Sequence, residues 1–154
     1  MLFCAVLLFV GPAAAFLGFG KCEITKADLL PCALSKCDFN GDGRLSLLES
    51  RYIFEEVLTG ANRWAAAQFT SPQIAIDHCG DVETGYVTAK TFMESEKCIE
   101  WCYEKRVFKR VVCDVLDDSD TAARERYVAF LNKNNLVDPD LAHDEDSNAV
   151  ADEF

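Results

Sequence analysis

Residues 38 to 49 read DFNGDGRLSLLE, a twelve-residue stretch in which oxygen-bearing side chains alternate with other residues. Asp38, Asn40 and Asp42 stand at its first, third and fifth positions, where they can place hard oxygen atoms on three sides of one centre. Gly43 follows directly, where the backbone must turn sharply through a conformation that other residues adopt only with strain. This spacing predicts a loop that folds around a hard cation.

The second half of the stretch completes the set of oxygen atoms. Glu49, at the twelfth position, can offer both carboxylate oxygens, Arg44 contributes its carbonyl, and Ser46 contacts the ion through a water. About seven oxygen ligands of this kind are typical of Ca²⁺. The alternative is a turn rich in Asn, Asp and Gly that joins two helices and binds no metal. The pattern favours calcium, and the expected ligands are Asp38, Asn40, Asp42, Arg44, Ser46 and Glu49.

Helical patterns flank the stretch on both sides. Before it, Asp28 is expected to cap a helix and Pro31 to lie in the first turn, where a missing N–H costs nothing. After it, an apolar stripe continues until Gly60, which is expected to end the exiting helix. Apolar residues at helical spacing predict one buried face. Its expected members are Leu30, Ala33, Leu34, Cys37, Ile53, Phe54 and Val57.

A second copy of this scaffold lies forty-two residues further along the chain. Residues 71–72 read Ser-Pro, a typical helix start, and Gly85 aligns with Gly43. Val87 aligns with Leu45, the apolar eighth position of the first loop. We therefore expect the two loops to pair through a short β-contact between Leu45 and Val87.

The second copy does not repeat the ligands. Its first, third, fifth and twelfth positions hold Gly80, Val82, Thr84 and Thr91, so none of them is a carboxylate. We expect this loop to be a structural partner that binds no ion. Weak binding through an irregular loop that starts at Asp77 is the open alternative.

A third, partial match begins at Asp114, with Asp118 at its fifth position and Glu125 at its twelfth. Its glycine and its third ligand are absent. The simpler interpretation, which we favour, is a long helix over residues 88–116, an Asp-rich break, and a last helix capped by Asp120. That helix is expected to bury Ala123, Val128 or Tyr127, Phe130 and Leu131.

The two ends of the chain differ from its centre. The first residues form an apolar run, broken by Gly-Pro and followed by three alanines, which predicts a secretory signal peptide over residues 1–15. A membrane anchor over residues 2–19 is the alternative. Residues 138–154, rich in Asp and Glu, are expected to form a solvated, disordered tail.

Length and charge narrow the class of protein. The 154 residues suit one compact domain, expected over residues 22–136. The formal net charge of −11 argues against nucleic-acid partners and anionic membranes, because no basic cluster is available to meet phosphates. An acidic surface favours cations instead.

Cysteine usage agrees with secretion. Without the signal segment, seven of the eight cysteines remain: Cys22, Cys32, Cys37, Cys79, Cys98, Cys102 and Cys113. In an oxidising compartment they predict up to three bridges and one thiol, which either links a second chain in a dimer or stays buried. Cys98 and Cys102 are expected one turn apart on one helix, each bridging to a neighbouring segment. Candidate partners are Cys22, Cys32 and Cys113, and the connectivity is open.

The chain resembles members of the EF-hand superfamily through residues 38–49, and more broadly through residues 28–103. The chain also resembles the extracellular calcium-binding module of the SPARC family. The feature that carries this resemblance is a cysteine, Cys37, directly before the loop of a secreted, disulfide-bearing hand pair. The resemblance implies an all-α fold: an EF-hand pair with one competent loop (hand 1, about 28–59) and one degenerate loop (hand 2, about 72–103). An additional C-terminal helix and disulfides would brace the pair.

The expected function is that of a secreted, extracellular protein that binds Ca²⁺ through one loop. A structural or buffering role in extracellular matrix, secretory fluid or a mineral-associated setting suits millimolar extracellular calcium. The alternative is a secreted module that binds an extracellular protein partner and whose fold calcium and disulfides stabilise. An enzyme is not expected, because no nucleophile, base and orienting group occur together.

Overall fold

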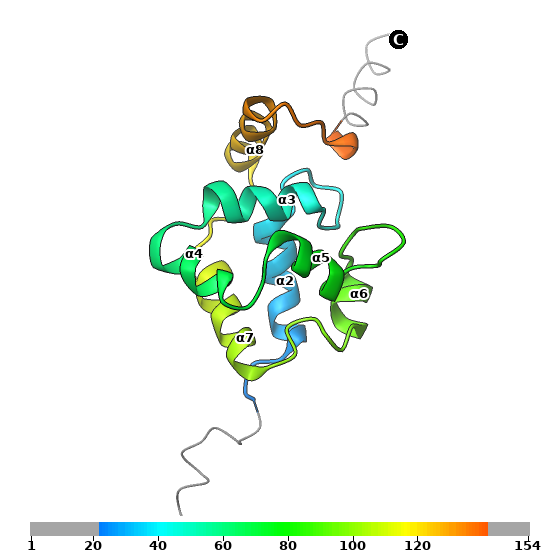
Figure 1. Cartoon of the computed structure of the whole chain (residues 1–154), viewed down its shortest axis with the longest axis vertical. Coiled ribbons are helices and arrows are strands. Elements are labelled where there is room, and N and C mark those ends of the chain that lie inside the picture. The colour runs from blue at the N-terminus through cyan, green and yellow to red at the C-terminus, as the bar shows by residue number, and fades with distance from the viewer. Residues whose placement is uncertain (1–21, 142–154) are drawn as a thin grey trace, which may run out of the picture.

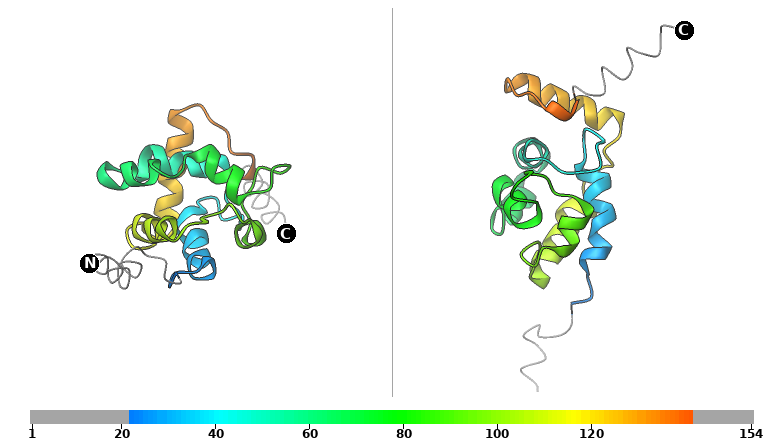
Figure 2. Two further views of the ribbon diagram at one scale, coloured as in Figure 1. Left: turned by 60° about the horizontal axis from the view of Figure 1, so that its bottom comes forward. Right: turned by 90° about the vertical axis from the view of Figure 1, so that its right-hand side faces the viewer.

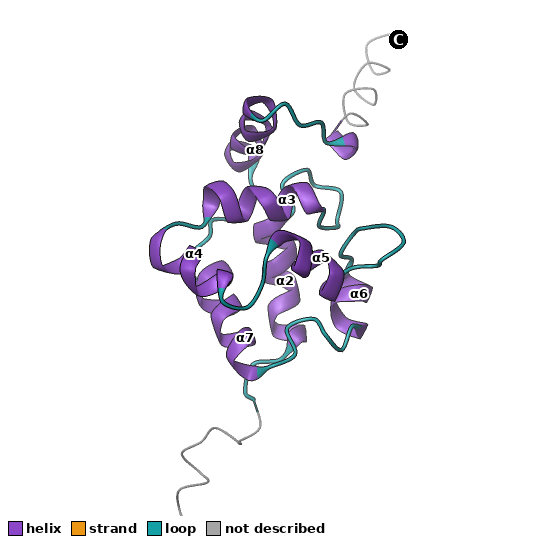
Figure 3. Cartoon of the chain, in the orientation of Figure 1, coloured by secondary structure: helices purple, strands orange, loops and turns teal. Residues whose placement is uncertain are grey.

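The computed structural model describes residues 22–141, and this part of the chain is mostly helical (Figure 1). No β-strand forms within these residues (Figure 3), and η1 and η2 are π-helical continuations of the helices before them. The elements are α2 (Lys26–Cys37), α3 (Leu47–Tyr52), η1 (Ile53–Val57), α4 (Gly60–Ala67), α5 (Pro72–Cys79), α6 (Ala89–Glu94), α7 (Cys102–Phe108), η2 (Lys109–Cys113) and α8 (Thr121–Lys133). The expected signal peptide, residues 1–15, lies outside the described residues.

Helix α2 begins earlier than expected. Thr25 caps it, and Asp28 is the third helical residue, whose carboxylate accepts the Thr25 N–H at 2.8 Å. The expectation of Asp28 as the cap was therefore wrong, because a reciprocal capping box competes better than a single cap. Pro31 consequently lies inside the helix rather than in its first turn. The fully buried face includes Leu29 in place of the expected Leu30.

The exiting helix of the first unit also ends earlier than expected. Helix α3 continues into η1, which stops at Val57, and Leu58 turns into the core with 3% exposure. Gly60 does not end this helix, because it begins α4 with a φ of +52°. The prediction for Gly60 was wrong for a local reason: a glycine marks a turn without telling which helix the turn belongs to.

The two helix–loop–helix units meet through their loops. The Leu45 N–H donates to the Val87 carbonyl at 2.8 Å, and the Val87 N–H donates to the Leu45 carbonyl at 2.9 Å. The expected β-contact is thus confirmed as an isolated antiparallel bridge. Ser71 caps α5, with Pro72 as its first residue, as expected.

The expected long helix over residues 88–116 is wrong. Helix α6 ends at Glu94, residues 95–101 are non-helical with a turn at 96–99, and Ile99 has a φ of +47°. Cys98 is fully buried and bridges to Cys79, so it cannot share a helical face with Cys102. Covalent pairing has overridden helix periodicity here.

Three disulfides and one free thiol occur among the described residues, as predicted. Cys22 pairs with Cys102, Cys32 with Cys113, and Cys79 with Cys98. The first two bridges fasten α2 and the residues before it to α7 and η2, across sequence separations of 80 and 81. Cys37 is free and buried, which is the packing role expected as one of its two alternatives.

Helix α8 lies across one end of the molecule as a separate layer (Figure 2). Asp120 caps it by accepting the Ala123 N–H at 2.9 Å, and the buried residues are Ala123, Tyr127, Phe130 and Leu131, as predicted. Two residues of the third, partial loop match lie apart in function: Asp118 forms an ion pair with Lys36 at 3.0 Å, and Glu125 is exposed on α8.

Among the described residues, no helix is long and apolar enough to cross a membrane.

Candidate functional site

The loop between α2 and α3 is anchored in the core through its second residue. The Phe39 ring lies 4.9 Å from the Tyr52 ring and 5.6 Å from the Tyr127 ring, measured between centroids. Phe39 is 5% exposed. Together with the Leu45–Val87 bridge, this contact holds the loop at two separate points, one against α8 and one against the second loop.

Glu49 closes the loop from its far end. Its side chain is completely buried, and its Oε1 accepts the N–H groups of Phe39 at 2.7 Å and Asn40 at 3.2 Å. Its Oε2 accepts the Ser46 N–H at 2.9 Å, while the Ser46 hydroxyl accepts the Glu49 N–H at 3.2 Å. The last predicted ligand thus ties the first turn of α3 to the start of the loop.

The other side-chain oxygens fold back along the loop backbone. Asp38 accepts the Gly41 and Gly43 N–H groups through separate oxygens, both at 2.9 Å. The Asn40 oxygen accepts the Asp42 N–H at 3.1 Å. Gly43 has a φ of +80°, the left-handed conformation that the sequence predicted for it. Hydrogen bonds within residues 38–43 therefore hold the first three predicted ligands, Asp38, Asn40 and Asp42, in one short segment.

Burial dominates the electrostatics of this loop. Together with the nearby Asp38 carboxylate, it raises the pKa of the Glu49 carboxyl to about 8, against the opposing effect of the backbone N–H groups. Burial raises the pKa of Asp38 as well. Within residues 22–141, no lysine, arginine or histidine forms an ion pair with Glu49. A positive charge placed beside these carboxylates would therefore be stabilising.

Arg44 has a more specific place than its sequence position indicates. Its guanidinium contacts Asp42 at 3.0 Å and Asp140 at 3.0 Å, and it stacks 3.7 Å above the centre of the Tyr86 ring. The side chain therefore links both loops to the C-terminal segment. These contacts involve only the side chain, whereas the atom predicted to be a ligand is the backbone carbonyl of Arg44.

Among the described residues, no three His, Cys, Asp or Glu side chains lie close enough together to hold a metal ion. Only Asp38, Asp42 and Glu49 of the predicted set belong to these types. Their oxygens accept loop N–H groups, and Asp42 also contacts Arg44. The remaining predicted donors are an amide, a hydroxyl and a carbonyl, so the set as a whole is made of oxygen atoms.

The beginning of the expected tail is part of the site. Asp138 is 4% exposed, and its Oδ2 accepts the Asn40 side-chain N–H at 3.2 Å and the Tyr127 hydroxyl at 2.8 Å. Asp140 accepts the Tyr86 hydroxyl at 2.8 Å. The expectation of a solvated tail from residue 138 was therefore wrong for residues 138–141, and residues 142–154 lie outside the described part.

No sequence signal separated Asp138 from the acidic residues that follow it. Its partner Asn40 is 98 residues away, and local composition carries no information on such a contact. Tyr127 was expected on the buried face of α8, but its hydrogen bond to a buried carboxylate was not.

The second loop is built in another way. The Asp81 carbonyl accepts the Gly85 N–H at 2.8 Å, and the Asp81 N–H donates to the Tyr86 carbonyl at 3.0 Å. A Cβ atom at Gly80 would lie 2.7 Å from the Ile76 carbonyl oxygen and 2.9 Å from that of Tyr86. Its first position therefore has no room for a side chain without a shift of the backbone.

The alternative loop start, Asp77, has its own local contact. Asp77 lies inside α5, where its carboxylate accepts the Gln73 side-chain N–H at 2.8 Å.

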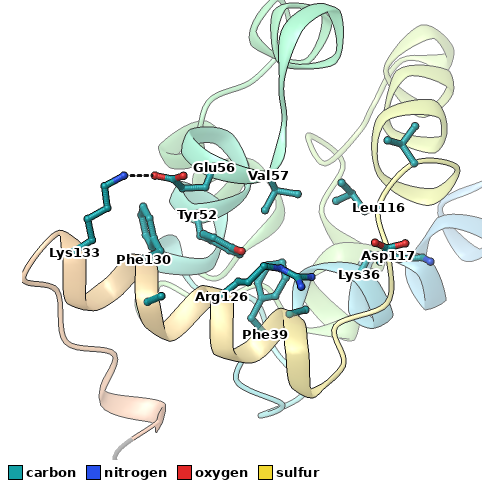
Figure 4. A pocket seen from close by; sticks show the side chains of 13 residues that line it. Lys36, Phe39, Tyr52, Glu56, Val57, Leu116, Asp117, Arg126, Phe130 and Lys133 are labelled. Carbon is teal, nitrogen blue, oxygen red and sulfur yellow. Dashed lines mark hydrogen bonds and ion pairs between the residues drawn. The ribbon is translucent and has the colours of Figure 1, made fainter.

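A groove of about 540 Å³ runs between α8 and η1 (Figure 4). Figure 4 shows Phe39, Tyr52, Arg126 and Phe130 along its length, with Lys133 and Glu56 at one end and Lys36 and Asp117 at the other. Lys133 contacts Glu56 at 3.2 Å. The groove therefore combines an apolar floor with side chains of both charges.

Comparison with known proteins gives no family: no protein-family model, no curated protein and no solved structure matches the chain.

Proposed function

We propose that this chain is a secreted calcium-binding protein in which one loop, residues 38–49, binds a single Ca²⁺. In this proposal the two helix–loop–helix units are an EF-hand pair, and the second, degenerate hand is a structural partner. The observation that carries the proposal is the placement of Glu49, fully buried at the twelfth position and reaching back to the start of the loop. The proposed ligands are the side chains of Asp38, Asn40, Asp42 and Glu49, the Arg44 carbonyl, and Ser46 through a water.

The chemistry of the donors supports calcium over softer metals. All of them are oxygen atoms, which hard cations prefer, and the loop offers neither thiolate nor imidazole. Bound Ca²⁺ would supply Glu49 with the positive charge that no basic side chain within residues 22–141 provides.

The contact between the loops supports a paired arrangement. The Leu45–Val87 bridge joins the eighth positions of the two loops, and the Cys79–Cys98 bridge joins the entering helix of the second unit to the segment after its exiting helix. The second unit therefore supports the first without needing an ion of its own.

Three disulfides support an oxidising, extracellular setting. Extracellular calcium is millimolar, and modules there commonly bind with a Kd of about 10⁻⁴ to 10⁻³ M. A single site under those conditions is close to saturated, so we propose a structural or buffering role rather than a switch.

The test is a calorimetric Ca²⁺ titration of the disulfide-bonded protein and of Glu49→Gln. We expect one site in the wild type and an affinity about 100-fold or more weaker in the variant, which corresponds to about 2.7 kcal/mol. Loss of a charged bidentate ligand is the physical reason. Glu55→Gln removes the same charge from an exposed position on η1 and should change the affinity by no more than about twofold.

Two results would contradict the proposal. One is the absence of binding heat at millimolar Ca²⁺ in the wild type. The other is equal affinity of Glu49→Gln and Glu55→Gln, which would move the ion away from the loop.

The groove between α8 and η1 favours a second candidate function, the binding of an extracellular protein partner. Its apolar floor and mixed charges are typical of protein interfaces. Recovery of a partner from extracellular fluid, compared between wild type and Arg126→Glu, tests it. A partner that binds both equally would argue against the groove.

A further inference from the structure

We infer that Asp138 is a positioning residue for the calcium site: it holds the Asn40 amide so that the oxygen, and not the nitrogen, is available to the ion. This inference rests on the proposed calcium function of the loop. It makes the segment after α8 a working part of a site that lies about a hundred residues earlier in the chain.

The Asn40 amide needs an external group to select its orientation. Its oxygen and its NH₂ group have nearly the same shape, but only the oxygen can ligate a cation. Asp138, as a carboxylate, only accepts hydrogen bonds, and its Oδ2 lies 3.2 Å from Asn40 Nδ2. The opposite orientation would face the amide oxygen toward that carboxylate and the NH₂ group toward the Asp42 N–H. Both contacts would be repulsive.

Burial of both side chains fixes the orientation of the Asn40 amide. Asn40 is 2% exposed and Asp138 is 4% exposed, so water cannot easily replace either partner. The orientation is therefore set by the protein before any ion arrives.

Asp138 is itself held in place from α8. Its Oδ2 accepts the hydroxyl of Tyr127, which is completely buried, at 2.8 Å. Its Oδ1 accepts the Asp140 N–H at 2.9 Å. Asp140 in turn contacts Arg44 and Tyr86, one from each loop. Both carboxylate oxygens of Asp138 are thus committed, which prevents the side chain from rotating away.

The first experiment measures Ca²⁺ affinity by calorimetry in wild type, in Asp138→Asn and in the exchange variant Asn40→Asp with Asp138→Asn. Asp138→Asn replaces one acceptor oxygen by a donor, so we expect an affinity about tenfold weaker, as for other outer partners of metal ligands. The exchange variant keeps the total charge and the hydrogen bond, with the amide now donating from position 138. We expect its affinity to return to within about threefold of wild type.

Asp117→Asn is the matched control, because it makes the same chemical change at an exposed position before α8, outside the loop and the residues that hold Asp138. It should change the affinity by no more than about twofold.

A second measurement needs no calcium. In metal-free wild type, the Asn40 side-chain amide protons should be shifted and slow to exchange in the NMR spectrum, since one of them faces a buried carboxylate. Asp138→Asn should remove both signatures. A role of Asp138 in stability alone would lower the melting temperature of the exchange variant and the single variant equally and would leave the amide signals in place.

Three outcomes would overturn the inference. Unchanged affinity in Asp138→Asn would show that the amide needs no such partner. If Asp138→Asn does not fold on its own account, the exchange variant decides. If the exchange variant folds but binds Ca²⁺ tenfold more weakly than wild type, the hydrogen bond between positions 40 and 138 does not set the affinity. Wild type without any Ca²⁺ binding would overturn the proposed function, and this inference with it, whereas the first two outcomes leave the calcium site standing.

Discussion

The two loops of this molecule share one scaffold and are held closed by different means. In the first loop the third position, Asn40, is 2% exposed, whereas the equivalent Val82 in the second loop is 90% exposed. The first loop turns its polar side chains inward and closes on Glu49. The second closes through its own backbone, and the Cys79–Cys98 bridge lies beside it. The two loops therefore reach closure through different contacts.

The largest effect that would test this contrast is loss of that bridge. Replacing Cys79 and Cys98 together by alanine should lower the free energy of unfolding by about 3 kcal/mol, because the bridge closes a loop with a sequence separation of 19. Denaturant titration at saturating Ca²⁺ measures it.

The control for this prediction is Cys37→Ala, which removes a buried thiol that forms no bridge and should cost about 1 kcal/mol. Equal stability of the bridge variant and this control would mean that the second loop holds itself closed.

A smaller effect is expected at the first position of the second loop. Gly80→Ala should cost about 1 to 3 kcal/mol, because the added Cβ would meet two backbone carbonyl oxygens below 3.0 Å. Chemical denaturation reports it. Glu83→Ala, exposed in the same loop, should stay within about 0.5 kcal/mol.

If Gly80→Ala proves neutral, the second loop is looser than its hydrogen bonds indicate. In that case a carboxylate could be introduced there, and the two loops would differ only in sequence and not in backbone.

The smallest effect is expected at Val82. Val82→Asp restores a carboxylate at the third ligand position, yet the side chain points to solvent, so stability should change by less than about 0.5 kcal/mol. Calorimetry should still find one calcium site. A stoichiometry of two would break the comparison between the loops.

Local patterns predicted several features whose deciding contacts are local. The Asp120 cap of α8, the buried face with Tyr127 and Phe130, and the Ser-Pro start of α5 all depend on residues three or four apart. The Leu45–Val87 bridge could be predicted from the sequence because the two units repeat one pattern. The same local reasoning failed at Gly60, where two helices adjoin one turn.

The sequence by itself determined which residues form the loop at 38–49 and how many cysteines can pair. It also determined that the second loop, residues 80–91, has no carboxylate at the corresponding ligand positions. Tertiary structure alone decided the rest. It broke the helix expected over residues 88–116 by pairing Cys98 with Cys79, and it brought Asp138 from an apparently solvated tail onto Asn40. The physical reason is that caps, turns and ligand spacing are short-range properties of the chain, whereas a disulfide or a buried carboxylate is placed by partners that folding brings from far away.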